Sequence, residues 1–137
     1  MRAVLDPDVI VSALISPQGA PAKILREWLD GGYDLVVSPL LLAELERVLG
    51  YPKLRERVSK AEARELIELL RRGADMRADP SHVPPVRSAD PGDDYLIVLA
   101  SASQAVLVSG DRHLLSLSPD LPVYASARFL QVIPGPD

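Results

Sequence analysis

The chain opens with a short apolar run that ends in an acidic residue and continues at once as an apolar helix. Residues 1–5 are typical of a β-strand, and the stretch from Pro7 to Ile15 is typical of a helix. Proline suits the first helical position because its φ is preset and its missing N–H is not needed there, so Asp6 is a candidate N-cap. Asp8 falls in the first turn, where a carboxylate complements the helix dipole. Capping alone would explain either acid.

The same alternation of strand and helix continues along the chain. Further strands are predicted at 33–37, 75–78, 105–108 and 123–125, and further helices at 21–30, 39–49, 60–72, 95–104, 113–117 and 126–132. Crossover connections between such strands produce a parallel sheet that is covered by helices on both faces. We therefore predict an α/β fold with a parallel sheet of four or five strands, formed by a single domain over residues 1–137.

Composition excludes several classes of protein. The chain has no cysteine, so neither a disulfide framework nor a thiolate metal site can form. No apolar run approaches the length of a membrane span, and the N-terminus lacks the basic and apolar regions of a secretion signal. The sequence predicts a cytoplasmic protein with no membrane association.

Positive charge is concentrated in one segment of an otherwise acidic chain. The net charge is −4, but residues 47–72 contain eight basic and four acidic side chains, a local charge of +4. Two interpretations stay open: this segment contacts the phosphate backbone of RNA, with Arg71 and Arg72 as candidates, or it is a solvated helix face with internal Glu–Arg pairs.

Four acidic residues are placed to meet at one edge of the predicted sheet. Asp6 ends the first strand, Asp111 follows the strand at 105–108, and Asp94 begins the helix that leads into that strand. Glu44 projects from the helix at 39–49 within an arc of leucines, where a carboxylate is costly unless it is paired with a cation. Because ligand sites of open α/β sheets lie beyond the carboxyl ends of the strands, these acids are candidate site residues.

The start of the helix near residue 94 leaves the third acid open. An error of one residue in the helix start would exchange neighbours, so Asp93 is a second choice for the place of Asp94, and Asp90 competes with both.

Carboxylates that converge without a basic partner repel one another unless a metal ion joins them. Oxygen-only ligation favours Mg²⁺ or Mn²⁺. An ion held by carboxylates and water can generate hydroxide, orient a phosphate and stabilise a leaving oxygen, so the acids indicate phosphoryl chemistry without a catalytic histidine.

The spaced motifs also resemble the PIN-domain family, in particular its branch of toxins from toxin–antitoxin pairs. The resemblance rests on the strand that ends in Asp6 and on the runs Ser-Pro-Leu-Leu-Leu-Ala-Glu44-Leu-Glu-Arg-Val-Leu, Asp90-Pro-Gly-Asp-Asp94-Tyr-Leu-Ile-Val-Leu-Ala and Val-Ser-Gly-Asp111-Arg-His-Leu-Leu. It covers almost the whole chain.

The resemblance implies a three-layer α/β/α sandwich and Mg²⁺- or Mn²⁺-dependent cleavage of RNA. It carries the catalytic and metal-binding acids of the family onto Asp6, Glu44, Asp94 and Asp111, with Asp8 as a second choice of metal ligand and Ser109 as a supporting hydroxyl. It also implies an antitoxin protein as partner and a homodimer. One departure stands out: Asp6-Pro-Asp8 replaces the usual Asp-Thr-Asn or Asp-Ser-Asn.

Two other functions fit parts of the sequence. The Asp-x-Asp at Asp6 is similar to that of haloacid-dehalogenase-type phosphatases, but Leu115 occupies the place of the second aspartate in their later Gly-Asp-x-x-x-Asp motif. The other hypothesis is a catalytically weak PIN domain that binds RNA or a protein, and the proline at position 7 keeps that hypothesis open.

Overall fold

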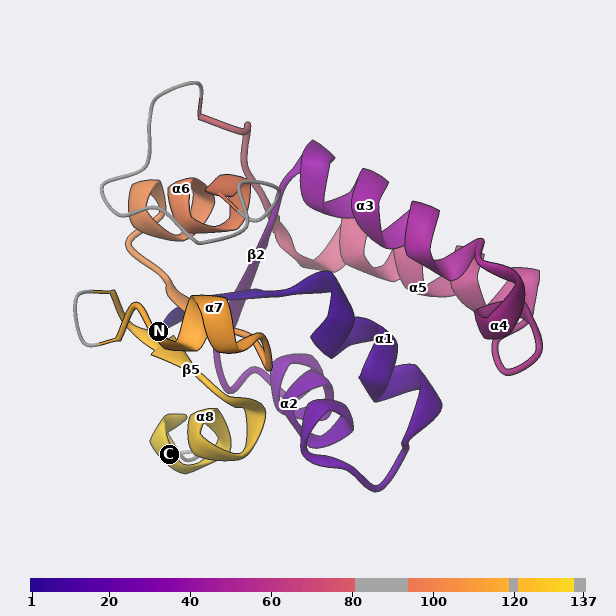
Figure 1. Ribbon diagram of the computed structural model, residues 1–137, viewed down its shortest axis with the longest axis horizontal. Coiled ribbons are helices and arrows are strands. Elements are labelled where there is room, and N and C mark those ends of the chain that lie inside the picture. Colours follow the sequence, from indigo (N-terminus) through magenta and orange to yellow (C-terminus); the bar gives the residue numbers. More distant parts are fainter. Residues whose placement is uncertain (81–93, 119–120, 135–137) are drawn as a thin grey trace.

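The computed structural model describes residues 1–80, 94–118 and 121–134, and these form a five-stranded, entirely parallel sheet flanked by helices (Figure 1). The strands lie in the order β3-β2-β1-β4-β5. Their bounds are β1 Arg2–Leu5, β2 Asp34–Val37, β3 Asp75–Met76, β4 Val106–Val108 and β5 Val123–Tyr124. The predicted parallel α/β sheet is confirmed.

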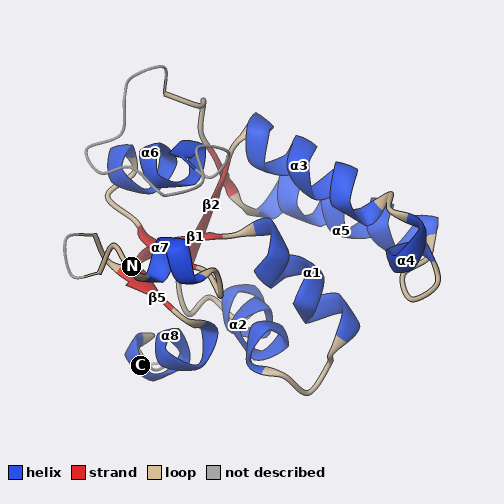
Figure 2. Cartoon of the chain, in the orientation of Figure 1, coloured by secondary structure: helices blue, strands red, loops and turns tan. Residues whose placement is uncertain are grey.

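Helices cover both faces of this sheet (Figure 2). They are α1 Pro7–Ile15, α2 Ala20–Leu29, α3 Pro39–Leu49, α4 Pro52–Arg55, α5 Lys60–Gly73, α6 Asp94–Ala102, α7 Arg112–Leu115 and α8 Ser126–Val132. Helix α6 packs against β1 and β4, α2 packs against α1 and α8, and α3 packs against α1 and α5. No helix in these described ranges is both long and apolar enough to cross a membrane.

Local sequence explains where the main helices begin. Prolines occupy the first turns of α1 and α3, directly after the N-caps Asp6 and Ser38. Ser59 and Glu62 form the predicted capping box at the start of α5. Each of these side chains satisfies an amide that the first helical turn leaves without a partner.

Several details differ from the sequence-based expectation. Strand β3 ends at Met76 rather than at residue 78, and α7 covers Arg112–Leu115 rather than 113–117. Helix α6 ends at Ala102 rather than at residue 104, because Gln104 adopts a left-handed conformation with φ of 52° and the amide of Ala105 bonds to the carbonyl of Ala100. The short helix α4 was not predicted, since its four residues are too few to show a helical period.

The buried strands place the ends of β1 and β4 level with each other. Ala3, Val4 and Leu5 are at most 1% exposed, and Leu5 pairs with Val108. From β1 the chain winds outward to β2 and β3, and it returns to the other side for β4 and β5. The direction of winding therefore reverses between β1 and β4, which is where open α/β sheets bind their ligands.

Candidate functional site

Asp6 is a buried carboxylate at the point where the winding reverses. It follows β1, is 7% exposed, and donates its backbone amide to the carbonyl of Val108 at 2.9 Å. Its Oδ1 accepts a hydrogen bond from the amide of Asp8 at 3.0 Å, and its Oδ2 accepts one from the hydroxyl of Ser109 at 2.8 Å. One carboxylate oxygen is therefore oriented by the first turn of α1 and the other by the residue that directly follows β4.

Ser109 connects the two strand ends. Its fully buried hydroxyl donates to Asp6 and accepts from the amide of Asp111 at 3.0 Å. Asp111 in turn caps α7, because its Oδ1 accepts from the amide of His113 at 2.8 Å. A Cβ atom built on the intervening Gly110 would meet open space, so the turn is open to solvent on that side.

Negative charge gathers around Asp6. Burial raises the pKa of the Asp6 carboxyl, the hydrogen bonds from Asp8 and Ser109 lower that pKa, and the charges of Asp8 and Asp111 raise it again. Two further carboxylates therefore act on the charge of Asp6 at this edge of the sheet. Such a group is stabilised by a bound cation more than by any uncharged ligand.

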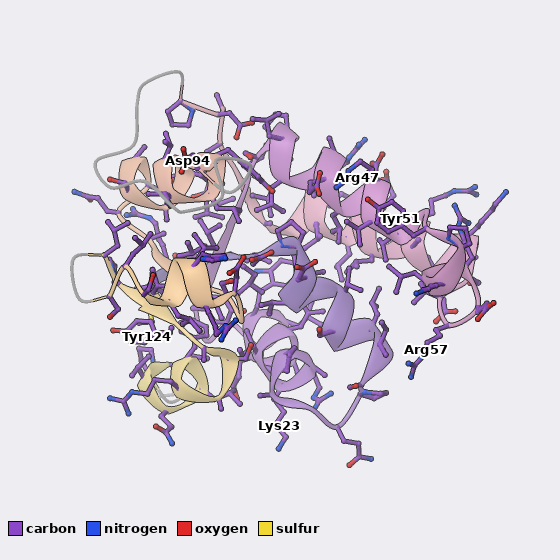
Figure 3. All side chains as sticks on the ribbon, viewed as in Figure 1. Lys23, Arg47, Tyr51, Arg57, Asp94 and Tyr124 are labelled. Carbon is purple, nitrogen blue, oxygen red and sulfur yellow. The ribbon has the colours of Figure 1, made fainter. Side chains whose placement is uncertain are left out.

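Glu44 corrects one of our predictions. It was expected to be buried among leucines without a cation, but its side chain is 36% exposed and forms a two-pronged ion pair with Arg47, one turn later on α3. Arg47 also contacts the hydroxyl of Tyr51, and its guanidinium lies 5.3 Å from the centre of the Tyr51 ring (Figure 3). These hydrogen bonds from Arg47 lower the pKa of Glu44.

The sequence contains a signal for this pair that the prediction missed. Glu44 and Arg47 are three residues apart, and oppositely charged side chains at that spacing face each other on a helix. The prediction placed Arg47 outside the apolar arc and did not allow for the length of its side chain, which reaches back to Glu44.

Asp94 is the first residue of α6 and is partly buried and engaged in interactions (Figure 3). Helix α6 packs on β1 and β4, the strands that Asp6 and Ser109 directly follow. The alternatives Asp93 and Asp90 lie outside the described residues.

The proposed RNA contacts at the end of α5 are both exposed. Arg71 pairs with Glu46 of α3 at 3.1 Å, and Arg72 contacts the carbonyl of Glu68 within its own helix. The solvated-face hypothesis expected Glu–Arg pairs within residues 47–72, and neither of these two contacts is one, so both hypotheses for this segment stay open.

The donors around Asp6 suit a hard divalent cation in their chemistry. They are carboxylate oxygens, and burial makes the Asp6 charge costly without a positive partner. Across residues 1–80, 94–118 and 121–134, no three acidic or histidine side chains are grouped closely enough to hold a metal ion as they stand. Asp6 is the fixed member of the candidate metal site, because hydrogen bonds hold both of its carboxylate oxygens.

Comparison with known proteins agrees with the fold. The chain is similar to the crystal structure of VapBC2 from Rickettsia felis bound to a DNA fragment from their promoter, with a TM-score of 0.61 and 15% identity over 90% of this chain and 97% of that one. It is 30% identical to the uncharacterized protein MJ1680 of Methanocaldococcus jannaschii over 117 residues, which are 85% of this chain and 75% of the relative.

A family model decides the assignment. The model described as the PIN domain matches residues 2–113, a range that contains Asp6, Glu44, Asp94 and Asp111. Most of the chain and all four candidate acids fall within the match, and the chain therefore belongs to the PIN-domain family.

Proposed function

We propose that the protein is a metal-dependent endoribonuclease that hydrolyses RNA phosphodiesters at Asp6, Glu44, Asp94 and Asp111. Members of the PIN-domain family are generally nucleases and generally use divalent metal ions. The RNA substrate, the choice of Mg²⁺ or Mn²⁺ and the four named residues are our proposal. Asp8 and Asp93 are the further candidate ligands.

One observation carries the proposal. Asp6 is buried, held at both oxygens, and repelled by Asp8 and Asp111 at the reversal point of the sheet. The N-cap at the neighbouring strand end is the uncharged Ser38, so capping by itself does not require a carboxylate at such a position. A carboxylate that costs free energy in the folded protein is best explained by a ligand of opposite charge.

The residues of this chain would have distinct tasks. Asp6 is the fixed ligand, and Ser109 is the positioning residue that holds it through Oδ2. To bind the ion, Asp111 would give up its hydrogen bond from the amide of His113. Glu44 would likewise give up its ion pair with Arg47. When bound, Mg²⁺ or Mn²⁺ supplies an activated water and stabilises the charge of the leaving oxygen.

A narrower assignment follows from the motifs. Their resemblance to the toxin branch of the family supports a toxin of a toxin–antitoxin pair, with an antitoxin protein as partner, a homodimeric state and a cytoplasmic location. The fold likeness to VapBC2 supports the antitoxin partner within this assignment.

Metal-dependent stabilisation followed by an RNA-cleavage assay tests the proposal. Millimolar Mn²⁺ should raise the melting temperature, because a ligand that binds only the folded state stabilises it by mass action. Asp6→Asn and Asp111→Asn should each remove most of this shift. Asp34→Asn is the matched control, because Asp34 is exposed at the opposite, amino-terminal end of β2.

Cleavage should stop in EDTA and return with Mg²⁺ or Mn²⁺. Ca²⁺ should bind but support cleavage poorly, because its looser coordination activates water less well. A protein that melts identically with and without Mn²⁺ and cleaves no RNA would instead be the binding module of our alternative hypothesis.

A further inference from the structure

Tyr51 is an aromatic residue that the protein leaves in solvent. It is 44% exposed, and its backbone is fixed at the junction of α3 and α4: its amide donates to the carbonyl of Val48 at 3.1 Å, and its carbonyl accepts from the amide of Leu54 at 3.0 Å. All six aromatic residues of the chain lie within the described ranges, and the other five are buried or half-buried: Trp28, Tyr33, Tyr95, Tyr124 and Phe129. Tyr51 therefore offers a ring that the core does not use.

Glu44, Arg47 and Tyr51 form a row along one face of α3. Spacings of three and four residues place side chains one turn apart on the same face of a helix. The contacts agree, because Nε of Arg47 donates to Oε2 of Glu44 at 3.0 Å and the guanidinium lies 5.3 Å from the centre of the Tyr51 ring (Figure 3). Seven residues correspond to about 10 Å along a helix axis, so Tyr51 lies near Glu44 but beyond the reach of an ion held there.

Arg47 and the proposed metal ion need the same carboxylate. The two-pronged pair with Arg47 uses both oxygens of Glu44, so Arg47 has to leave Glu44 when an ion binds there. The guanidinium would then keep Tyr51 as a neighbour and lack an anion. A phosphate offers a guanidinium the same two-pronged contact as a carboxylate, so a phosphate beside the ion is the natural replacement.

We propose that Arg47 and Tyr51 bind one nucleotide of single-stranded RNA next to the candidate metal site. The Tyr51 ring stacks on the base, and Arg47, released from Glu44, binds a phosphate of the same strand. Stacking on an aromatic side chain accepts any base but needs a base that is free, so this pair favours single strands over duplexes. The inference deepens the proposed nuclease function, on which it rests.

This pair of side chains fits a nucleotide better than an acidic peptide. Carboxylates of a peptide would satisfy Arg47 but leave the Tyr51 ring in water, whereas a nucleotide joins a flat base to an anion. A strand of RNA also continues past one nucleotide. Lys53 and Arg55 of the adjoining α4 are exposed and form no ion pair with any residue in the described part of the chain, so they add positive charge where the next phosphates would lie.

Fluorescence anisotropy tests the contact of Tyr51 with a base. The probe is a labelled oligouridylate of about eight nucleotides, free or annealed to oligoadenylate, in Ca²⁺ and again in EDTA. Tyr51→Leu should weaken binding of the single strand by about fivefold or more and leave duplex binding within about twofold. Tyr51→Phe keeps the ring and should bind the single strand as the unchanged protein does. Circular dichroism checks that both variants keep their helices.

Arg47→Gln should move two readouts in opposite directions. It removes the competitor for Glu44, so the Mn²⁺-induced rise in melting temperature should become larger. It also removes the phosphate contact, so single-strand binding in Ca²⁺ should weaken by about fivefold or more. Arg128→Gln is the matched control, because it removes the same charge from an exposed position on α8, and it should change neither readout. A residue that only stabilised α3 would not produce opposite effects.

The outcomes separate this inference from the proposed function. If Mn²⁺ stabilises the protein and RNA is cleaved, but Tyr51→Leu binds single strands normally, the inference is wrong and the nuclease proposal stands. If the protein neither responds to Mn²⁺ nor cleaves RNA, but Tyr51→Leu still loses only single-strand binding, the nuclease proposal fails and the base contact is supported.

Three further results would overturn the inference. The first is that Tyr51→Leu weakens single-strand and duplex binding equally. The second is that Arg128→Gln weakens single-strand binding as much as Arg47→Gln does. The third is that polyglutamate binds as tightly as oligouridylate and is lost in the Tyr51→Leu and Arg47→Gln variants, which would make an acidic peptide the ligand.

Discussion

Replacing Ser109 with alanine should destabilise the protein through the charge of Asp6. The Ser109 hydroxyl is fully buried and makes two hydrogen bonds, to Oδ2 of Asp6 at 2.8 Å and from the amide of Asp111 at 3.0 Å. A hydrogen bond to a charged group contributes about 1.5–3 kcal/mol, and a neutral one about 1 kcal/mol. We therefore expect the free energy of unfolding to fall by about 2.5–4 kcal/mol at neutral pH.

Ser38 supplies a matched control at the neighbouring strand end. It is equally buried, follows β2 as Ser109 follows β4, and its hydroxyl accepts from the amide of Leu41 at 3.2 Å. Its hydrogen bonds within the described part of the chain include no carboxylate partner. Ser38→Ala should cost about 1 kcal/mol, the usual loss for a helix N-cap, and this cost should not depend on pH in acid.

The two variants should differ most clearly in their pH dependence. Burial raises the pKa of Asp6 above 3.8 and the Ser109 hydrogen bond lowers it, so Ser109→Ala should raise that pKa further. A raised carboxyl pKa means that the folded state binds more protons, so stability falls as pH rises through the raised pKa. The cost of Ser109→Ala should thus be small in acid and grow toward neutral pH.

Urea unfolding of both variants at about pH 4 and about pH 8 measures this difference, with each unit of pKa change worth about 1.4 kcal/mol. If Ser109→Ala costs the same at both pH values, or no more than Ser38→Ala at pH 8, the hydroxyl does not hold an ionised Asp6. A second measurement addresses the site: the Mn²⁺-induced rise in melting temperature should shrink in Ser109→Ala and persist in Ser38→Ala.

Three further predictions follow from the same geometry. Asp6→Asn should stabilise the metal-free protein at neutral pH, because it removes a buried charge, and urea unfolding should show no gain in acid, where Asp6 is already protonated. Glu44→Gln should abolish metal-dependent cleavage and cost only about 0–1 kcal/mol, since it breaks a surface pair with Arg47; cleavage that persists would remove Glu44 from the site. Neutralising Arg71 and Arg72 together should weaken RNA binding and flatten its salt dependence, and an unchanged slope would leave a solvated helix face.

Much of the fold can be predicted from the sequence because its determinants are local. A proline directly after the N-caps Asp6 and Ser38 favours a helix start at both places without any tertiary contact. The capping box at Ser59 and Glu62 acts over four residues, and the apolar runs of the strands have no alternative to burial. These features set the order of the elements, and that order requires a parallel sheet.

Only the tertiary structure decided which side chains meet. Asp6 and Ser109 are 103 residues apart, and their hydrogen bond exists because β1 and β4 pair level with each other at the reversal of the sheet. The sequence pattern indicated both residues without joining them. The residue spacing along α3 is likewise compatible with two environments for Glu44, burial among leucines or an ion pair with Arg47. In the folded protein Glu44 is exposed enough for Arg47 to reach it.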